Sequence, residues 1–274
     1  MVVFPNAKIN LGLYITARRP DGYHEIETVM IPVDWHDILE IVPAKGTSAT
    51  LTVTGRRVDC PPEKNLVMKA YRALDTVVPL PPLDIYLHKI VPDGAGLGGG
   101  SADAAFTLTA INSMLDLQLG ADCLKEIAAK LGADCPMFID NSPVLATGIG
   151  TTLSPITLPS LTGLTVVIAK PCEGVSTALA YAAITPRPHE VPITDIISRP
   201  VKSWRDTLVN DFEPGISAIH PEISRLRNLF YDCGALYSAM SGSGSAVYGL
   251  FDNAKMADTA YRKAGTTDIH IGTL

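Results

Sequence analysis

The sequence predicts a two-domain α+β protein. Segments in which apolar and polar residues alternate, as in strands, are mixed along the chain with segments whose apolar residues have helical spacing. A stretch rich in proline, serine and threonine at residues 152–163 interrupts this pattern and precedes a new apolar strand. We therefore expect an N-terminal domain at 1–155 and a C-terminal domain at 156–274.

The upstream half contains three predicted strands and three predicted helices. The strands are "AKINLGLYITARR", "ATLTVTG" and "LDIYLHK", which alternate between apolar and polar residues. The helices are "EKNLVMKAYRALDTV", "ADAAFTLTAINSMLD" and "ADCLKEIAAKLGAD". We expect the third helix to begin at Asp122 as its N-cap and to end at Gly132 as its C′ residue.

The downstream half mixes strands and helices in the same way. It opens with the apolar strand "LTVVIAK", and residues 185–200 look like a long surface connection. Two helices, "PEISRLRNLFYDCG" and "NAKMADTAYRKAG", alternate with the strands "ALYSAM", "SAVYGLF" and "DIHIGTL". This order indicates an α+β sandwich.

Composition and charge exclude several classes of function. Hydrophobic residues make up 47% and charged residues 18% of the 274 residues, which is typical of a globular protein. The net charge is −6 and no basic run exceeds two residues, so nucleic-acid binding is not expected. The five scattered cysteines fit neither a zinc site nor a disulfide framework. Without a signal-peptide pattern or an apolar run of about 18 residues, we expect a cytoplasmic protein with no membrane partner.

The segment "PDGAGLGGGSADAA", residues 92–105, nearly matches two nucleotide-binding motifs. Its glycines from Gly94 to Gly99 fit the dinucleotide fingerprint G-x-G-x-x-G. They also fit the phosphate loop G-x-x-x-x-G-K-S/T ending at Ser101, except that Gly100 replaces the lysine. A strand precedes the loop and a helix follows it, so backbone N–H groups and a helix N-terminus converge on one point.

Neither of these two motifs fits the surrounding sequence. The dinucleotide fold requires a strand after the helix, ending in an acidic residue about 20 positions on. Here residues 116–131 lead into a second helix, and Asp122 looks like a helix cap. The phosphate loop lacks its lysine. We therefore expect the glycines to bind a polyphosphate through backbone N–H groups, with the side-chain cation supplied from another segment.

Three further segments are unusual for their positions. Lys8 lies inside an apolar strand, where it is either functional or an edge lysine that reaches solvent. Asp134, in "LGADCPMF", is either functional or a turn residue before Pro136. The Gly/Ser-rich segment "MSGSGSAVYGLF", residues 240–251, is either a second ligand loop or a hairpin turn.

Together these segments resemble the GHMP kinase superfamily. The resemblance is carried by "PNAKINLGL", "PDGAGLGGGSADAA", "LGADCPMF" and "MSGSGSAVYGLF", in the family order between residues 5 and 251. "RRPDGYHEIETVM", residues 18–30, resembles the branch that phosphorylates a cytidine-diphosphate ester of methylerythritol in the non-mevalonate isoprenoid pathway. The chain departs from the family at Ala102, where serine is commoner, and at Cys135, where valine is commoner.

The resemblance implies a fold, an activity and cofactors. The implied fold has an N-terminal domain like ribosomal protein S5 domain 2 and a C-terminal ferredoxin-like domain. The implied activity is ATP-dependent phosphorylation of the 2-hydroxyl of the cytidylated substrate, with Mg²⁺ as a second cofactor. The magnesium ligands stay open, with Ser101 as a candidate. We expect a monomer or a weak homodimer.

The resemblance also implies roles for individual residues. Asp134 would accept or orient the proton of the acceptor hydroxyl, and Lys8 would stabilise charge on the transferring group. The residues implied to bind ATP are Pro92, Asp93, Gly94, Ala95, Gly96, Leu97, Gly98, Gly99, Gly100, Ser101, Ala102 and, at the adenine, Asn65. Asn65 also has the simpler interpretation of a helix cap, and Lys89 either matches a family lysine or is a solvated strand residue.

Five residues are implied to bind the substrate. Tyr23 and His24 match family positions that hold the cytosine base, and Tyr181 resembles the aromatic residue on its other face. Asn10 and Thr177 look like polar contacts to the substrate. For Tyr181, a core position on a helix face is the equally simple alternative.

Three other functions stay open at this point. The chain could be another kinase of the superfamily, for mevalonate, homoserine or galactose, although such substrates have no use for an aromatic pair. It could be a non-catalytic nucleotide-binding module, although binding alone needs neither Lys8 nor Asp134. A nicotinamide dehydrogenase is the most distant alternative.

Overall fold

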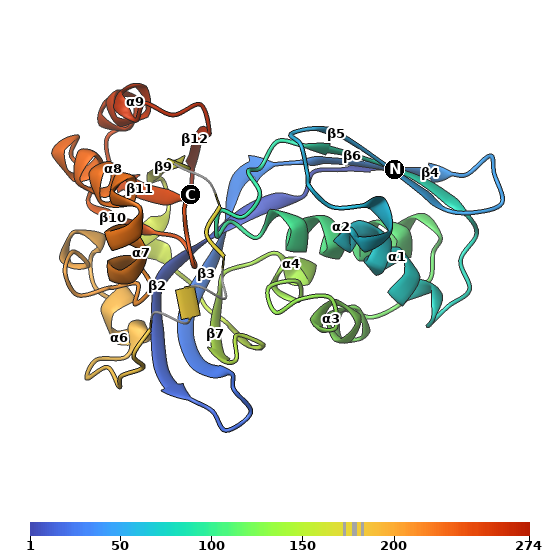
Figure 1. Cartoon of the computed structure of the whole chain (residues 1–274), viewed down its shortest axis with the longest axis horizontal. Helices are drawn as coiled ribbons and strands as arrows, with labels where there is room; N and C mark the ends of the chain where they lie inside the picture. Colours follow the sequence, from blue (N-terminus) through green and yellow to red (C-terminus); the bar gives the residue numbers. More distant parts are fainter. Residues whose placement is uncertain (172–173, 177–179, 182–183) are drawn as a thin grey trace. The chain divides into compact units, whose positions relative to one another are not determined.

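The chain folds into two compact units. The computed structural model describes residues 1–171, 174–176, 180–181 and 184–274 (Figure 1). The first unit consists of Met1–Ala7, Trp35–Asp93 and Gly98–Ser142, and the second of Lys8–Asp34, Gly94–Leu97 and Pro143–Leu274. These units interleave along the chain, which is a different division from the expected boundary at residue 155. That boundary stays a prediction.

A four-stranded sheet in the order β1-β4-β6-β5 forms one layer of the first unit. Its strands are β1 (Val2–Val3), β4 (Ile38–Pro43), β6 (Leu83–Lys89) and β5 (Thr50–Gly55). β4 and β6 are antiparallel, whereas β5 and β6 run parallel. Parallel neighbours need a crossover connection, which here contains the 3-10 helix η1 (Pro62–Lys64) and the helix α1 (Leu66–Asp75).

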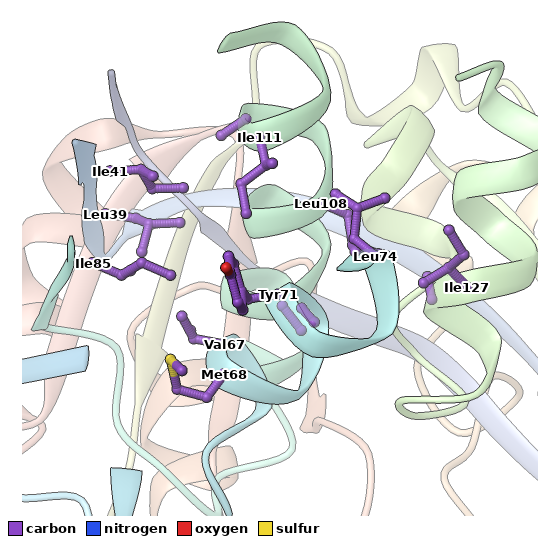
Figure 2. Packing of buried hydrophobic residues seen from close by; sticks show 14 of the residues in the cluster. Leu39, Ile41, Val67, Met68, Tyr71, Leu74, Ile85, Leu108, Ile111 and Ile127 are labelled. Carbon is purple, nitrogen blue, oxygen red and sulfur yellow. The ribbon is translucent and has the colours of Figure 1, made fainter. Parts of the chain in front are cut away.

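Helices pack against one face of this sheet to form the core of the first unit. α1 and α2 (Gly99–Met114) lie against the sheet, and α3 (Ala121–Ala129) and the short α4 (Met137–Asp140) pack against α2 (Figure 1). Strand alternation points one set of apolar residues at the helices, whose own apolar residues face the sheet. Figure 2 shows this core, with labelled residues Leu39, Ile41, Val67, Met68, Tyr71, Leu74, Ile85, Leu108, Ile111 and Ile127.

The second unit contains two four-stranded sheets. The first has the order β2-β3-β7-β8, with β2 (Asn6–Arg18), β3 (His24–His36), β7 (Val144–Gly148) and β8 (Thr152–Pro155). The second has the order β10-β11-β9-β12, with β10 (Tyr237–Met240), β11 (Val247–Phe251), β9 (Thr165–Ala169) and β12 (Ile269–Thr273). Every pair of neighbouring strands in the second sheet is antiparallel.

Helices α8 (Pro221–Asp232) and α9 (Ala254–Lys263) pack against the second sheet (Figure 1). The chain order β9, α8, β10, β11, α9, β12 is the β-α-β-β-α-β arrangement of ferredoxin-like folds, so this expectation is confirmed. Three residues of α8 are fully buried in the hydrophobic core that these helices share with the second sheet, namely Ile223, Leu226 and Phe230. The remaining elements of this unit are η2 (Pro159–Leu161), α6 (Ile193–Ile197), η3 (Val201–Ser203) and α7 (Glu213–Ile219).

Each predicted strand and helix forms at its expected place, but one pair of helix ends differs. The N-cap of α3 is Gly120, and Asp122 lies in the first turn of that helix. The C-cap is Lys130, so Gly132 lies one residue beyond the C′ position. The helix dipole attracts an acidic side chain in the first turn, such as that of Asp122, even when this side chain does not cap the helix. In the described part of the chain, no helix has both the length and the apolar character needed to span a membrane.

Candidate active site

Lys8 lies in β2, and its backbone is tied to the glycine-rich loop. Its N–H donates to the carbonyl oxygen of Leu97 at 2.8 Å, so the two segments meet within the second unit. Lys8 is only 3% exposed, so the interpretation as a lysine that reaches solvent is wrong. Its ammonium donates to Oδ1 of Asn10 at 2.6 Å, from two residues along the same face of the strand. The structure thus brings Lys8 and Asn10 together.

The glycine-rich loop alternates between two backbone conformations. Gly94, Gly96 and Gly98 have φ values of 60°, 75° and 70°, whereas Ala95 and Leu97 between them do not have positive φ. An alternation of left-handed and other residues is the backbone pattern typical of anion-binding nests. The backbone of the loop is therefore suited to phosphate oxygens.

The segment 240–251 forms the β10–β11 hairpin, as the simpler interpretation predicts. Its turn also contacts the glycine-rich loop. The hydroxyl of Ser241 donates to the carbonyl oxygen of Gly96 at 3.0 Å and accepts from the N–H of Asn10 at 3.2 Å. A Cβ on Gly96 would lie 2.1 Å from the Ser241 carbonyl oxygen, so this backbone-to-backbone approach requires glycine.

Helix α2 begins directly after the loop. Gly98 is its N-cap, and the first helical hydrogen bond runs from the N–H of Ala102 to the carbonyl oxygen of Gly98 at 2.9 Å. The N–H groups of residues 99–101, directly before Ala102, therefore lie at the positive end of this sixteen-residue helix. Burial raises the pKa of the Cys135 thiol to about 11, although its hydrogen bond with Ser101 acts in the opposite direction. Cys135 is thus a neutral, buried thiol beside the first turn of α2.

Lys89, at the end of β6, is buried in a cluster of charges. Its ammonium donates to Oδ2 of Asp103 at 2.8 Å and to Oδ2 of Asp37. Because Lys89 is 5% exposed, the interpretation as a solvated strand residue is wrong. Asp37 also accepts from the N–H groups of Ile90 at 2.5 Å and Val91 at 2.8 Å. The cluster therefore links β6, the chain leading to the loop, and α2.

The charges in this cluster are not balanced, because two carboxylates face one ammonium. Burial acts to lower the pKa of Lys89, but the two carboxylates outweigh it and leave that pKa raised. Burial raises the pKa of Asp103 to about 7, against the lowering effect of Lys89. In the described part of the chain, Oδ1 of Asp103 is buried without a hydrogen-bond partner. Asp103 is therefore the member of the cluster that takes up a proton near neutral pH.

Asn65 is the N-cap of α1, as its simpler interpretation predicts. Its Oδ1 accepts from the N–H of Val67 at 2.9 Å, and the residue is 8% exposed. This contact satisfies one backbone donor at the start of the helix. Its expected contact with adenine stays a prediction.

The aromatic residues expected to hold a base lie in the second unit. His24 stacks on Tyr181 with ring centroids 4.9 Å apart and an angle of 23° between the rings, and Tyr181 also meets Phe212 edge to face. Tyr181 thus has the core contacts that the alternative interpretation predicts. Tyr23 is 62% exposed. Thr177 lies outside the described residues.

Asp134 lies in the turn between α3 and α4 of the first unit and is half-buried. The turn interpretation of its position is therefore correct, and its catalytic role stays a proposal. Ahead of the loop, Pro92 is buried and Asp93 is exposed. Over residues 1–171, 174–176, 180–181 and 184–274, no group of three or more His, Cys, Asp or Glu side chains is arranged to hold a metal ion.

Two family models match this chain. The model of the GHMP kinases N terminal domain matches residues 65–142, and that of the GHMP kinases C terminal matches residues 196–268. Together they cover more than half of the chain. The chain belongs to the GHMP kinase family. This GHMP kinase is therefore a phosphotransferase that uses ATP, and its two-domain fold of mixed helices and sheets is that of the family.

Individual relatives cover 92% or more of this GHMP kinase. A curated 4-diphosphocytidyl-2-C-methyl-D-erythritol kinase from Parabacteroides distasonis is 51% identical over 252 residues, or 92% of each chain. A solved structure of a 4-(cytidine 5'-diphospho)-2C-methyl-D-erythritol kinase has a TM-score of 0.85 at 31% identity, covering 100% of this chain and 98% of that one. A homoserine kinase from Cytophaga hutchinsonii has a TM-score of 0.71 at 21% identity, covering 100% and 94%, and shares the fold alone.

Several buried polar residues of the two units were given no role from the sequence. Asp37 lies outside every motif, whereas Asp103 and Thr28 lie inside quoted motifs without having been assigned a function. Asn210 was missed as well, and its amide donates to the carbonyl oxygens of Met240 and Gly242 at 2.8 Å. A polar residue within an apolar segment is the one signal that could have found them, and it does not identify a partner.

Proposed function

We propose that this GHMP kinase transfers the γ-phosphoryl group of ATP to the 2-hydroxyl of 4-diphosphocytidyl-2-C-methyl-D-erythritol. The observation that carries the proposal is the near-complete alignment with a curated relative of that name. The aromatic contact between His24 and Tyr181 supports it, because a cytosine base binds through stacking and edge contacts that such rings can supply.

The transfer assigns a role to each side chain. The acceptor oxygen forms a bond to the γ-phosphorus, the bond to the β–γ bridging oxygen breaks, and ADP leaves. The hydroxyl proton goes to the carboxylate of Asp134, and the ammonium of Lys8 stabilises negative charge on the transferring group. The loop from Pro92 to Ala102 binds the phosphates through backbone N–H groups, and Asn65 contacts the adenine. Such a reaction depends chiefly on positioning and electrostatics.

Magnesium fits this arrangement as a nucleotide-bound ion. Mg²⁺ in kinases is held by phosphate oxygens, water and one or two protein oxygens, so it needs no cage of protein ligands. The Ser101 hydroxyl, in the first turn of α2, is the protein oxygen that the loop offers. When bound, the ion would neutralise charge on the phosphates.

The direct test is an assay of the purified protein with ATP, Mg²⁺ and the cytidylated substrate. We expect ADP release, and a new phosphomonoester signal of the product in ³¹P NMR. Mevalonate, homoserine and galactose form the comparison panel. A preference for any of these three alcohols would overturn the proposal, because none of them carries a base.

The proposed base is tested by the pair Asp134→Ala and Asp134→Asn. Both variants should lose turnover sharply, since neither side chain can accept the proton, while ATP affinity stays close to that of the wild type. Wild-type turnover in either variant would contradict the role of Asp134. Tight ATP binding by a wild-type protein that turns over no alcohol would instead favour a non-catalytic nucleotide-binding module.

A further inference from the structure

A directed chain of hydrogen bonds leads from Lys8 to the backbone of its own strand. The Lys8 ammonium donates to Oδ1 of Asn10 at 2.6 Å, and Nδ2 of Asn10 donates to Oγ1 of Thr28 at 3.0 Å. The Thr28 hydroxyl donates to the carbonyl oxygen of Gly12 at 2.6 Å. Lys8, Asn10 and Thr28 are all at most 3% exposed, so water does not compete for these contacts.

The direction of each bond is set at the Gly12 end. A backbone carbonyl can only accept, so the single hydroxyl proton of Thr28 must point to Gly12. The Thr28 oxygen is then an acceptor for the Asn10 amide, which turns the Nδ2 group toward Thr28 and Oδ1 toward Lys8. A flipped amide would place its NH₂ group against the Lys8 ammonium, two donors facing each other. Thr28 therefore determines which end of Asn10 meets Lys8.

The backbone of Asn10 is held as firmly as its side chain. Its N–H donates to the Ser241 hydroxyl at 3.2 Å, and its carbonyl oxygen accepts from the Tyr248 hydroxyl at 2.8 Å. The anchor at Gly12 is also held, because the N–H of the next residue, Leu13, donates to the carbonyl oxygen of Val209 at 2.9 Å. With both ends fixed, the amide of Asn10 offers Lys8 one defined acceptor position.

A defined position matters for lysine more than for most side chains. Its four-carbon stem has high rotamer entropy, and its ammonium acts as a point charge without a preferred plane. The catalytic benefit of such a charge depends on its distance from the developing negative charge. A fixed acceptor at Asn10 restricts the ammonium before any ligand binds.

We propose that Thr28 is a positioning residue for phosphoryl transfer, which acts through Asn10 to hold the ammonium of Lys8 in place. The proposal rests on the proposed function, in which Lys8 stabilises the transferring group. It is separate from the substrate contact predicted for Asn10.

The test compares three variants of the full-length protein. Thr28→Val removes the hydroxyl and keeps the branched shape, whereas Thr28→Ser keeps the hydroxyl. The matched control is Thr107→Val, since Thr107 is also fully buried and its hydroxyl donates to one backbone carbonyl, that of Asp103, at 2.7 Å. Each variant is checked for folding by its thermal transition, and kcat and KM for both substrates are measured well below that transition.

We expect Thr28→Val to lower kcat by about 10- to 100-fold, as displacement of a catalytic group by about 1 Å does, with KM for ATP little changed. Thr28→Ser should restore most of kcat, and Thr107→Val should lose stability but keep kcat. Equal kcat in Thr28→Val and Thr107→Val would overturn the proposal. So would equal losses of kcat in Thr28→Val and Thr28→Ser.

A second measurement does not depend on turnover. The ¹³Cε signal of Lys8, assigned by its loss in Lys8→Met, should shift or broaden in Thr28→Val and stay in place in Thr107→Val. An unchanged signal in Thr28→Val contradicts the positioning role, whatever the substrate proves to be. If the wild type phosphorylates a different alcohol, the proposed function fails, and the kinetic comparison of Thr28 variants is made with that alcohol.

Discussion

Lys89 and Asp103 form a buried ion pair, with Nζ and Oδ2 2.8 Å apart and both side chains at most 4% exposed. The second carboxylate, Asp37, makes the cluster one negative charge in excess when both acids are ionised. A low-dielectric interior disfavours that excess, which is why Asp103 holds its proton to higher pH than an ordinary aspartate.

This raised pKa predicts a pH dependence of stability. Between pH 3.8, the ordinary value, and about 7, Asp103 is ionised in the unfolded chain and protonated in the folded one. The folded state binds the extra proton, so its stability falls as pH rises through this window, by at most about 1.4 kcal/mol per pH unit. Asp103→Asn should remove this contribution.

Urea unfolding of the wild type and the variant at pH 5 and pH 7.5 measures the effect. We expect Asp103→Asn to become more stable relative to the wild type at the higher pH. Asp59→Asn is the control, since Asp59 has a side chain 98% exposed and should leave the difference between the two pH values unchanged. An Asp103→Asn variant whose pH dependence matches the wild type would contradict the assignment.

The two interpretations of Asn65 can be separated by substitution. Asn65→Ala removes the N-cap of α1 and should lower the free energy of unfolding by about 0.5–2 kcal/mol. Asn65→Asp and Asn65→Ser keep a capping oxygen, so stability should be largely retained. If Asn65 also contacts adenine, these two variants will raise KM for ATP. An unchanged KM for ATP in both variants would show that Asn65 acts only as the helix cap.

The stacked rings of His24 and Tyr181 must separate for a base to enter between them. The two rings are in direct contact, because their centroids are 4.9 Å apart and the centroids of interacting aromatic rings lie about 4.5–7 Å apart. Tyr181→Ala should raise KM for the cytidylated substrate by roughly 5- to 150-fold, which corresponds to about 1–3 kcal/mol of stacking. Tyr181→Phe keeps the ring and should stay near the wild type. KM for ATP serves as the internal control, and an equal rise in both KM values would indicate general disruption.

Gly96 and Gly100 should differ sharply in their tolerance of a methyl group. At Gly96, φ is 75° and an added Cβ would lie 2.1 Å from the Ser241 carbonyl oxygen. Gly96→Ala should therefore lower the free energy of unfolding by at least about 1–3 kcal/mol, the cost of a strained backbone. At Gly100 the nearest atom is Cδ1 of Leu66 at 3.7 Å, and alanine favours a helix more than glycine does. Thermal unfolding of the two variants measures this contrast. Equal destabilisation would show that the loop's contact with Ser241 has been overestimated.

Local patterns were sufficient to predict most elements but not all of them. The alternation in β6 and the helical spacing in α1 both report burial on one face, so these elements form where expected. The strands β1, β3, β4, β7 and β8 were not predicted. β7 and β8 are short, and β3 mixes apolar and polar residues without a regular period over its thirteen positions. Their pairing is decided by neighbouring strands and not by their own pattern.

By itself, the sequence determined the order of motifs, the family and the residue types at the candidate site. It singled out Lys8, Asp134 and the glycine-rich loop, because a lysine in an apolar strand and clustered glycines are locally improbable. Only the tertiary structure decided which buried polar groups meet. Lys89 joins Asp37 from 52 residues away, and Asn10 joins Thr28 from 18 residues away. The physical reason is that a buried polar group must find a partner in space, and local spacing along the chain does not specify which distant residue provides it.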